Sequence, residues 1–417
     1  MASAKRSLSR RQLLAGAAAF SLVRGARAGD EIKLGNARIL VGDGTELRGG
    51  VRIKDGVFAE VGPTVVGGLD MSGGVLYPGI YDGGSPMGLF EIDLEDGTHD
   101  EQEKSDAVTP HARITDAYNP RSEVIPVSRL GGVLGGLVIP GTTTLVPGQA
   151  AWMRTIGDTV EEATIVAPAG VVFTLGAGSE GETPGSPKSR MGVALKLRDL
   201  FDGNRPAVPP TTKPKKGAEP PKPPTAMQAA IHLVLKRETK AIFVADRASD
   251  IEVALQLAQA YQLDAVLLGG AEAHLIAGKL VAAKIPILLG PVTTQPDSWA
   301  TFYARYDNAA LLHAAGVRIA FRSGDIHTNR TLTEEAGIAV SYGLPFGTAI
   351  AALSGNGPSW WGLKVGQIKV GYEASLVWTD GDPLQQLTHV RGIWMRGAAV
   401  PLVSRQTKLF DRYRELK

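Results

Sequence analysis

The fold is decided by the stretch Leu76-Tyr77-Pro78-Gly79-Ile80-Tyr81-Asp82-Gly83-Gly84-Ser85-Pro86-Met87-Gly88. An apolar run at its start, Val75–Ile80, is typical of a strand that is buried on both faces of a sheet. Gly83 and Gly84 follow this run, and glycines of this kind are typical of a turn or loop. The stretch therefore predicts a buried strand that leads into a glycine-rich segment.

Apolar runs of the same kind recur through the middle of the chain, and helical patterns separate several of them. The further strands are expected at Leu134–Ile139, Val171–Leu175, Ala241–Ala245, Ala265–Leu268, Ile285–Leu289 and Val317–Phe321, and the clearest helices at Ile251–Tyr261, Ala271–Ala283 and Tyr306–Ala315. Continuous apolar strands alternating with helices indicate a parallel sheet. We expect an α/β fold with a (β/α)8 TIM-type barrel, whose unclear strand lies near Thr164–Val166. An open doubly wound sheet is the alternative.

Both ends of the chain are rich in short alternating strands joined by glycine turns. We expect residues 29–75 and 363–417 to form one small composite β-sandwich domain beside a barrel at 76–362. A segment rich in proline and lysine, 203–225, is expected to stay extended as an insertion in a barrel loop, although it could also link two domains.

The first residues have the pattern of an export signal. Arg10-Arg11 precedes the apolar run Leu13–Val23, and Ala26-Arg27-Ala28 is an A-x-A cleavage pattern. The run is shorter than the ~20 residues that span a bilayer. We expect 1–28 to be a twin-arginine signal peptide and the mature protein to be periplasmic; a free amphipathic helix is the alternative.

Charge and composition exclude several classes of function. Residues 1–28 hold six cations and no acid, so their removal changes the net charge from +2 to −4. No basic stripe is left for nucleic acid, and no long apolar run is left for a membrane. Without cysteine, the chain has neither a disulfide nor a thiol nucleophile.

Two loop motifs look functional but have simpler interpretations. Gly176–Gly181 matches G-x-G-x-x-G, but Pro184 and Pro187 forbid the helix that a dinucleotide site requires. The acidic run Glu91–Glu103 lacks the spacing of a calcium loop and is expected to be a solvated loop.

The opening stretch resembles the end of the first barrel strand in the amidohydrolase superfamily, where P-G-x-x-D-x-H-x-H supplies two metal-binding histidines. Further segments resemble the imidazolonepropionase-like branch and cover nearly all of the chain after the signal. They are Thr109-Pro110 with Arg113, Asp116–Pro120, Pro168-Ala169-Gly170, Gly343-Leu344-Pro345 and Gly371–Leu384. The resemblance implies the barrel and the composite β domain already expected, with hydrolysis of a C–N bond as the ancestral reaction.

The metal-ligand positions that this resemblance implies are vacant. They fall at Gly84, Pro86, Val172, Val244, Gly269 and Gly324. Relatives ionise a metal-bound water, which requires about three nitrogen or oxygen ligands. Glycine, proline and valine side chains supply none, so we expect no cofactor, and zinc only if a non-standard site exists. Asp325 and His327 are the expected members of such a site, with Asp325 as the candidate catalytic residue. Glu272 is expected to cap the helix that follows it.

Three functions remain open. The chain could be a pseudoenzyme that acts through binding, as the partner of an active paralogue or as a homo-oligomer. It could be an active hydrolase with a metal at Asp325 and His327, or with none. It could also be a small-molecule binding protein that uses the barrel mouth, with Arg113, Arg247 and Arg322 as candidates for anion capture.

Overall fold

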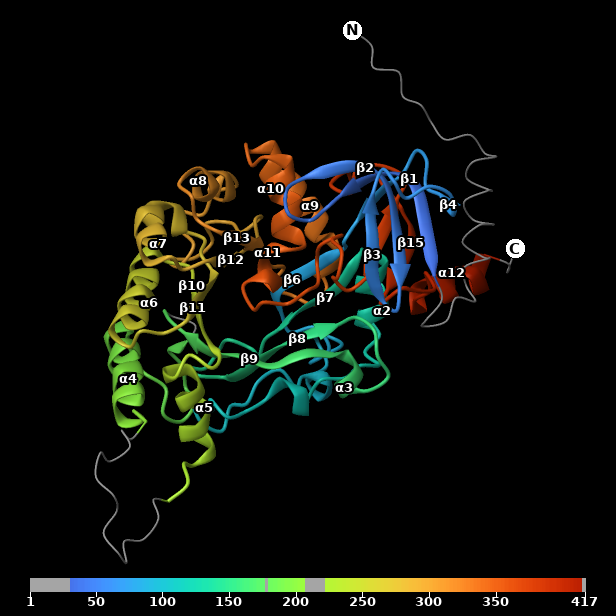
Figure 1. The fold of residues 1–417 in the computed structure, drawn as a ribbon. Coiled ribbons are helices and arrows are strands. Elements are labelled where there is room, and N and C mark those ends of the chain that lie inside the picture. The colour runs from blue at the N-terminus through green and yellow to red at the C-terminus, as the bar shows by residue number, and fades with distance from the viewer. Residues whose placement is uncertain (1–30, 177–178, 207–221, 415–417) are drawn as a thin grey trace, which may run out of the picture.

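The computed structural model describes residues 31–176, 179–206 and 222–414. The predicted signal peptide and most of the predicted proline-rich insertion lie outside the described residues. Two eight-stranded sheets organise the rest (Figure 1). One forms the barrel, and the other lies beside it and joins strands from both ends of the chain.

The barrel sheet has the strand order β13-β12-β11-β10-β9-β8-β7-β6. Its strands are β6 (Ile80–Ser85), β7 (Val133–Val138), β8 (Gly148–Arg154), β9 (Thr164–Thr174), β10 (Lys240–Ala245), β11 (Ala265–Gly269), β12 (Ile287–Leu289) and β13 (Ile319–Phe321). Six of the expected apolar runs appear among them as buried strands. The expected first run divides at the Pro78-Gly79 turn, because Val75–Tyr77 forms β5 in the other sheet and β6 begins at Ile80.

The expectation of an all-parallel barrel was wrong at one strand. Strand β8 runs antiparallel to both β7 and β9. The loop 139–147 that connects β7 to β8 holds no helix, and a parallel return needs a longer crossover. Thr164–Val166, expected as a separate strand, is the beginning of the long strand β9.

The two end strands of this sheet meet and nearly close the barrel. The amide of Gly324, after β13, donates to the carbonyl oxygen of Gly84 on β6 at 3.0 Å. A β-carbon at Gly83 would lie 2.7 Å from the carbonyl oxygen of Phe321, so β6 approaches β13 closely only because position 83 is glycine. This near closure excludes the open doubly wound alternative.

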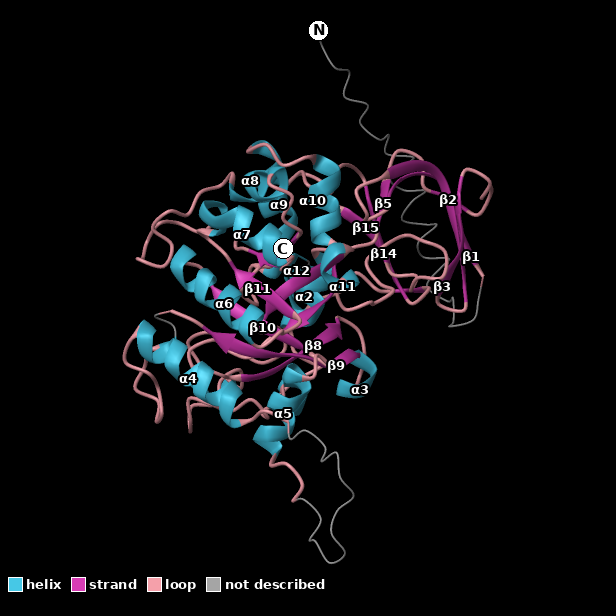
Figure 2. Ribbon diagram, turned by 60° about the vertical axis from the view of Figure 1, so that its left-hand side comes forward, coloured by secondary structure: helices cyan, strands magenta, loops and turns pink. Residues whose placement is uncertain are grey.

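Helices pack around the barrel, and several begin at a side-chain cap. Thr225 and Gln228 form a capping box on α5, and the hydroxyl of Ser189 caps α4. The helices are α2 (Val124–Leu130), α3 (Val160–Ala163), α4 (Arg190–Gly203), α5 (Ala226–Leu235), α6 (Ala248–Ala260), α7 (Ala277–Ala283), α8 (Asn308–Ala314), α9 (Leu332–Ser341), α10 (Phe346–Leu353), α11 (Asn356–Ser359) and α12 (Arg405–Arg414) (Figure 2). Within the described ranges, none of them has the length and apolar character needed to cross a bilayer.

The second sheet combines strands from both termini, as expected, and its strands form one continuous hydrogen-bonded order; the sandwich stays a prediction. Its order is β16-β15-β14-β5-β1-β2-β3, with β4 beside β1. The strands are β1 (Ile32–Leu40), β2 (Glu46–Lys54), β3 (Val57–Gly62), β4 (Leu69–Asp70), β5 (Val75–Tyr77), β14 (Leu376–Thr379), β15 (Val390–Met395) and β16 (Ala398–Ala399). The N-terminal and C-terminal strands join where β5 pairs with β14.

An ion pair fastens this sheet to the barrel. Arg154, at the end of β8, donates from Nε at 3.0 Å and Nη2 at 2.7 Å to Oε2 of Glu373, just before β14. Its Nη1 also donates to the carbonyl oxygen of Thr164. Both charged side chains are largely buried, at 15% and 13% exposed. Loss of one partner therefore leaves a poorly solvated charge.

We expect Glu373→Gln to lower the free energy of unfolding by about 3 kcal/mol, because Arg154 would keep a buried charge without a counterion. The measurement is equilibrium urea denaturation. Asp116→Asn is the matched control, because Asp116 pairs with Arg113 on the surface, and such pairs contribute at most about 1 kcal/mol. Equal losses in the two variants would contradict the assignment of the Arg154–Glu373 pair as a fastening.

Candidate functional site

The vacant positions lie around the barrel mouth or in the strands that lead to it. Gly84 is on β6 and Pro86 follows that strand, Gly269 ends β11, and Gly324 follows β13. The other two, Val172 on β9 and Val244 on β10, are buried among the core side chains. Because parallel strands of a barrel end at one face, these ends form a common surface.

The guanidinium of Arg322 fills the space beside two of the vacant positions. A β-carbon at Gly84 would lie 3.4 Å from Nε of Arg322, and one at Gly324 would lie 2.9 Å from Nη2. Nε also donates to the carbonyl oxygen of Gly84 at 3.2 Å. Side chains at positions 84 and 324 would therefore compete with Arg322 for one space.

Asp82 is held by the backbone and side chain that follow β13. Its Oδ1 accepts from the amides of Gly84 and Ser323, each at 3.0 Å, and its Oδ2 accepts from the Ser323 hydroxyl. These bonds connect β6 to the segment after β13. They satisfy the carboxylate within the protein.

Asp246 and Glu335 are the other carboxylates whose charges act on Arg322. Asp246 accepts from the amide of Ala271 at 3.1 Å, and Glu335 accepts from the amide of Val292 at 2.6 Å. Burial raises the pKa of both carboxyl groups, and the charge of Arg322 opposes that rise. Burial likewise lowers the pKa of Arg322, against the opposing charges of Asp246 and Asp82.

These residues do not fit the metal centre that the resemblance implies. The ligand positions carry no donor side chain, a cation stands beside two of them, and a β-carbon at Gly269 would lie 2.7 Å from Oδ1 of Asp246. Residues 31–176, 179–206 and 222–414 contain no group of three or more histidine and carboxylate side chains placed to hold a metal. A fixed guanidinium stands where metal chemistry would need ligands.

A hollow of about 760 Å³ adjoins the mouth next to Pro86 and Gly324. The acidic run Glu91–Glu103, expected as a solvated loop, supplies much of its wall. Besides Pro86 and Gly324, the lining residues are Phe90, Asp93, Asp96, His99, Glu101, Gln102, Lys104, Gly141, Asp325 and His327. Asp325 and His327, the expected members of a replacement site, therefore share this hollow.

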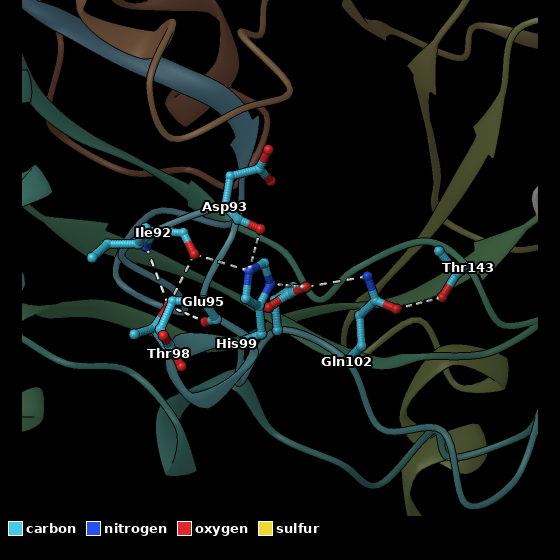
Figure 3. Close-up of polar contacts among 8 residues, drawn as sticks. Ile92, Asp93, Glu95, Thr98, His99, Gln102 and Thr143 are labelled. Atoms are coloured by element: carbon cyan, nitrogen blue, oxygen red, sulfur yellow. Dashed lines mark hydrogen bonds and ion pairs between the residues drawn. The ribbon is translucent and has the colours of Figure 1, made fainter.

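His99 holds the acidic run in place (Figure 3). Its Nδ1 lies 3.1 Å from Oε1 of Glu101, and its Nε2 lies 3.2 Å from the carbonyl oxygens of both Ile92 and Asp93. All three partners only accept hydrogen bonds, so both ring nitrogens donate when the imidazole is protonated. The hydrogen bond to Glu101 raises the pKa of His99.

The network extends from His99 to the loop between β7 and β8. Gln102 Nε2 donates to Glu101 Oε1 at 3.2 Å, and the Thr143 hydroxyl donates to Gln102 Oε1 at 2.7 Å (Figure 3). The ring of Phe90 stacks on His99 with centroids 4.8 Å apart and meets His327 edge-on. His99 thus joins the two sides of the hollow.

Of the three candidate arginines, only Arg322 reaches the centre of the mouth. Arg113 is exposed and pairs with Asp116 at 3.0 Å, in the short helix Ile114–Asp116. Arg247 stands at the N-cap of α6. Glu272 does not cap the helix that follows it, because its carboxylate accepts from the amide of Ala248 at 3.0 Å and so caps α6.

Sequence reasoning missed His99, Glu101 and Phe90. The available signal was a lone histidine inside a dense acidic run, directly after the strand that carries Asp82. Composition alone favours a solvated loop for such a run, and only the tertiary structure folds it back over the mouth.

The comparisons with known proteins agree with this architecture. An amidohydrolase from Thermotoga maritima MSB8 is similar, with a TM-score of 0.80 and 27% identity, over 90% of this chain and 100% of that one. A prolidase complexed with N-methylphosphonate-L-proline (TM-score 0.54, 16% identity, 89% and 99% of the two chains) and phenylurea hydrolase B (0.54, 13%, 89% and 97%) share the fold.

The comparison of sequences matches a much shorter part of the chain. A segment of 81 residues is 36% identical to the amidohydrolase tasK of Hapsidospora irregularis, and it spans 19% of this chain and 8% of that protein. No family model matches the chain. The structural neighbours are amidohydrolase-family proteins, so the predicted resemblance to that superfamily is confirmed. The imidazolonepropionase-like branch stays a prediction.

We expect the acidic run to loosen as the pH rises. A histidine whose pKa is raised by folding stabilises the folded state fully below its unfolded pKa of about 6.5. That stabilisation is lost as the pH rises through the higher folded value. Amide-exchange protection factors of Ile92–Gln102 should therefore fall above a pH of about 6.5, and His99→Gln should remove the dependence. Protection that stays constant with pH in the unmodified protein would refute the role of His99.

Proposed function

We propose that this chain is an exported protein of amidohydrolase fold that has lost metal-dependent hydrolysis and acts through binding at the barrel mouth. The observation that carries the proposal is the guanidinium of Arg322 beside the vacant positions Gly84 and Gly324. The loss is selective, since the barrel, the composite sheet and Asp82 are retained while the ligand side chains are missing.

The chemistry of the mouth supports binding over hydrolysis. A catalytic metal lowers the pKa of its bound water towards about 7, which generates a nucleophile at neutral pH. A guanidinium can attract an anion or donate hydrogen bonds, but it does not generate such a nucleophile. Arg322 therefore replaces the positive charge of a metal centre without its reactivity.

The proposal also includes the location of the protein and the kind of partner that it binds. The twin-arginine pattern at Arg10-Arg11 supports export of the mature protein to the periplasm. No cofactor is needed, and zinc would enter only through a non-standard site. The protein would act on a small molecule at the hollow, or as the inert partner of an active paralogue or a second copy of itself.

The proposal predicts that the protein carries well below one equivalent of metal. The test is mass spectrometry on protein purified from the periplasm of cells grown with added zinc, manganese and iron, after dialysis. About one retained equivalent in well-folded protein would overturn the proposal, because a structural or catalytic site holds its metal through dialysis. An active amidohydrolase prepared in parallel provides the positive control.

An active hydrolase is the second candidate, because Asp325 and His327 line the same hollow. Asp325 Oδ1 accepts from the amide of His327 at 2.9 Å, which orders this pair beside Gly324. If the pair carries out hydrolysis, Asp325→Ala should lower kcat/KM on dipeptides and cyclic amides at least a hundredfold. Glu103→Gln is the matched control, because Glu103 is exposed and does not line the hollow. Unchanged hydrolysis in Asp325→Ala would eliminate this candidate.

A further inference from the structure

The charges around the hollow are predominantly negative. Asp93, Asp96, Glu101 and Asp325 supply four carboxylates, whereas Lys104 and the two histidines, His99 and His327, supply three cations at most. Within the described part of the chain, Asp93, Asp96 and Asp325 take part in no ion pair, and His99 is the basic partner of Glu101. The hollow therefore keeps a net negative charge even when both histidines are protonated.

Glu101 provides a second, independent observation, because one of its carboxylate oxygens has no hydrogen-bond donor among the described residues. Its side chain lines the hollow and is only 9% exposed. Oε1 accepts from His99 and from Gln102, whereas Oε2 is buried without a hydrogen-bond donor among the described residues. A buried carboxylate oxygen without a donor is unfavourable, so a ligand that brings an N–H group to it gains from that contact.

The basic side chains considered for anion capture do not reverse this charge. None of Arg113, Arg247 and Arg322 lines the hollow. Arg113 is paired on the surface, and Arg322 lies among Asp82, Asp246 and Glu335. The ligand that complements the hollow is thus a cation.

The wall next to the carboxylates is aromatic. Phe90 lines the hollow, with His99 stacked on its ring and His327 at its edge. Such a wall can pack against a methylene chain while the carboxylates bind a charged end. An organic cation can contact both the aromatic wall and the carboxylates, whereas a bare metal ion would contact only the carboxylates.

We infer that the hollow beside the barrel mouth binds a small organic cation through an alkylammonium group, which Glu101 and Asp325 recognise and Phe90 packs against. This inference rests on the proposed function, since it names the ligand class of a protein that acts through binding. Recognition needs no covalent step.

The test is isothermal titration calorimetry of the mature protein with three five-carbon probes that differ in charge. These probes are 1,5-diaminopentane, pentane-1,5-diol and glutarate, and calcium chloride is titrated separately. We expect binding of the diamine, no heat from the diol or glutarate, and weaker diamine binding at high salt, because salt screens exposed charges.

Amino-acid substitutions show which carboxylates bind the diamine. Glu101→Gln should weaken diamine binding about tenfold, because it removes the buried charge and keeps the side-chain shape. Asp325→Asn should also weaken it, which keeps the test informative if Glu101→Gln folds poorly. Glu103→Gln is the matched control, because Glu103 is an exposed neighbour that does not line the hollow.

Preferred binding of glutarate, no binding of any probe, or calcium binding without diamine binding would each overturn the inference. Failure of the underlying proposal looks different, because it appears as retained metal or as hydrolysis that depends on Asp325. If the protein is free of metal and inactive but does not bind the diamine, the result refutes only the inference that the ligand is an organic cation.

Discussion

The structure of the barrel mouth depends on one guanidinium. Arg322 donates to the carbonyl oxygen of Gly84, and three carboxylates surround it without direct contact. Each carboxylate is already held by backbone amides, so the cation balances charge while the amides fix geometry. Glycine at 84 and 324 is the steric condition for this arrangement, since a larger residue at either position would meet Arg322.

A second buried charge, that of Arg154, connects the barrel to the composite sheet. Arg154 and Glu373 connect the end of the antiparallel strand β8 to the segment before β14, where the C-terminal strands enter the composite sheet. Arg322 and Arg154 thus act at opposite ends of the barrel. Arg322 contacts β6 from the segment after β13 at the mouth, and Arg154 connects β8 to the adjoining sheet at the other end.

The sequence predicted much of the fold and only part of the site. Apolar runs such as Ala241–Ala245 and Ala265–Leu268 match β10 and β11 almost residue by residue, because strands buried on both faces need continuous apolar side chains. The reversal of β8 was not predictable, because Gly148–Arg154 gives no sign of strand direction. Asp325 and His327 were found because they directly follow Gly324, where the resemblance implies a metal-binding aspartate. His99 was missed because two of its three partners, Ile92 O and Asp93 O, are backbone atoms that no side-chain pattern reveals.

The shared space at positions 84, 322 and 324 has an evolutionary consequence. A lineage that regained histidine at 84 first would force that ring against Arg322 and Leu268. A lineage that lost Arg322 first would leave Asp82, Asp246 and Glu335 without their cation. Neither single step is neutral, so the way back to a metal centre crosses a less stable intermediate in either order. Under the proposed loss of the metal, positions 84 and 322 would therefore have to change together.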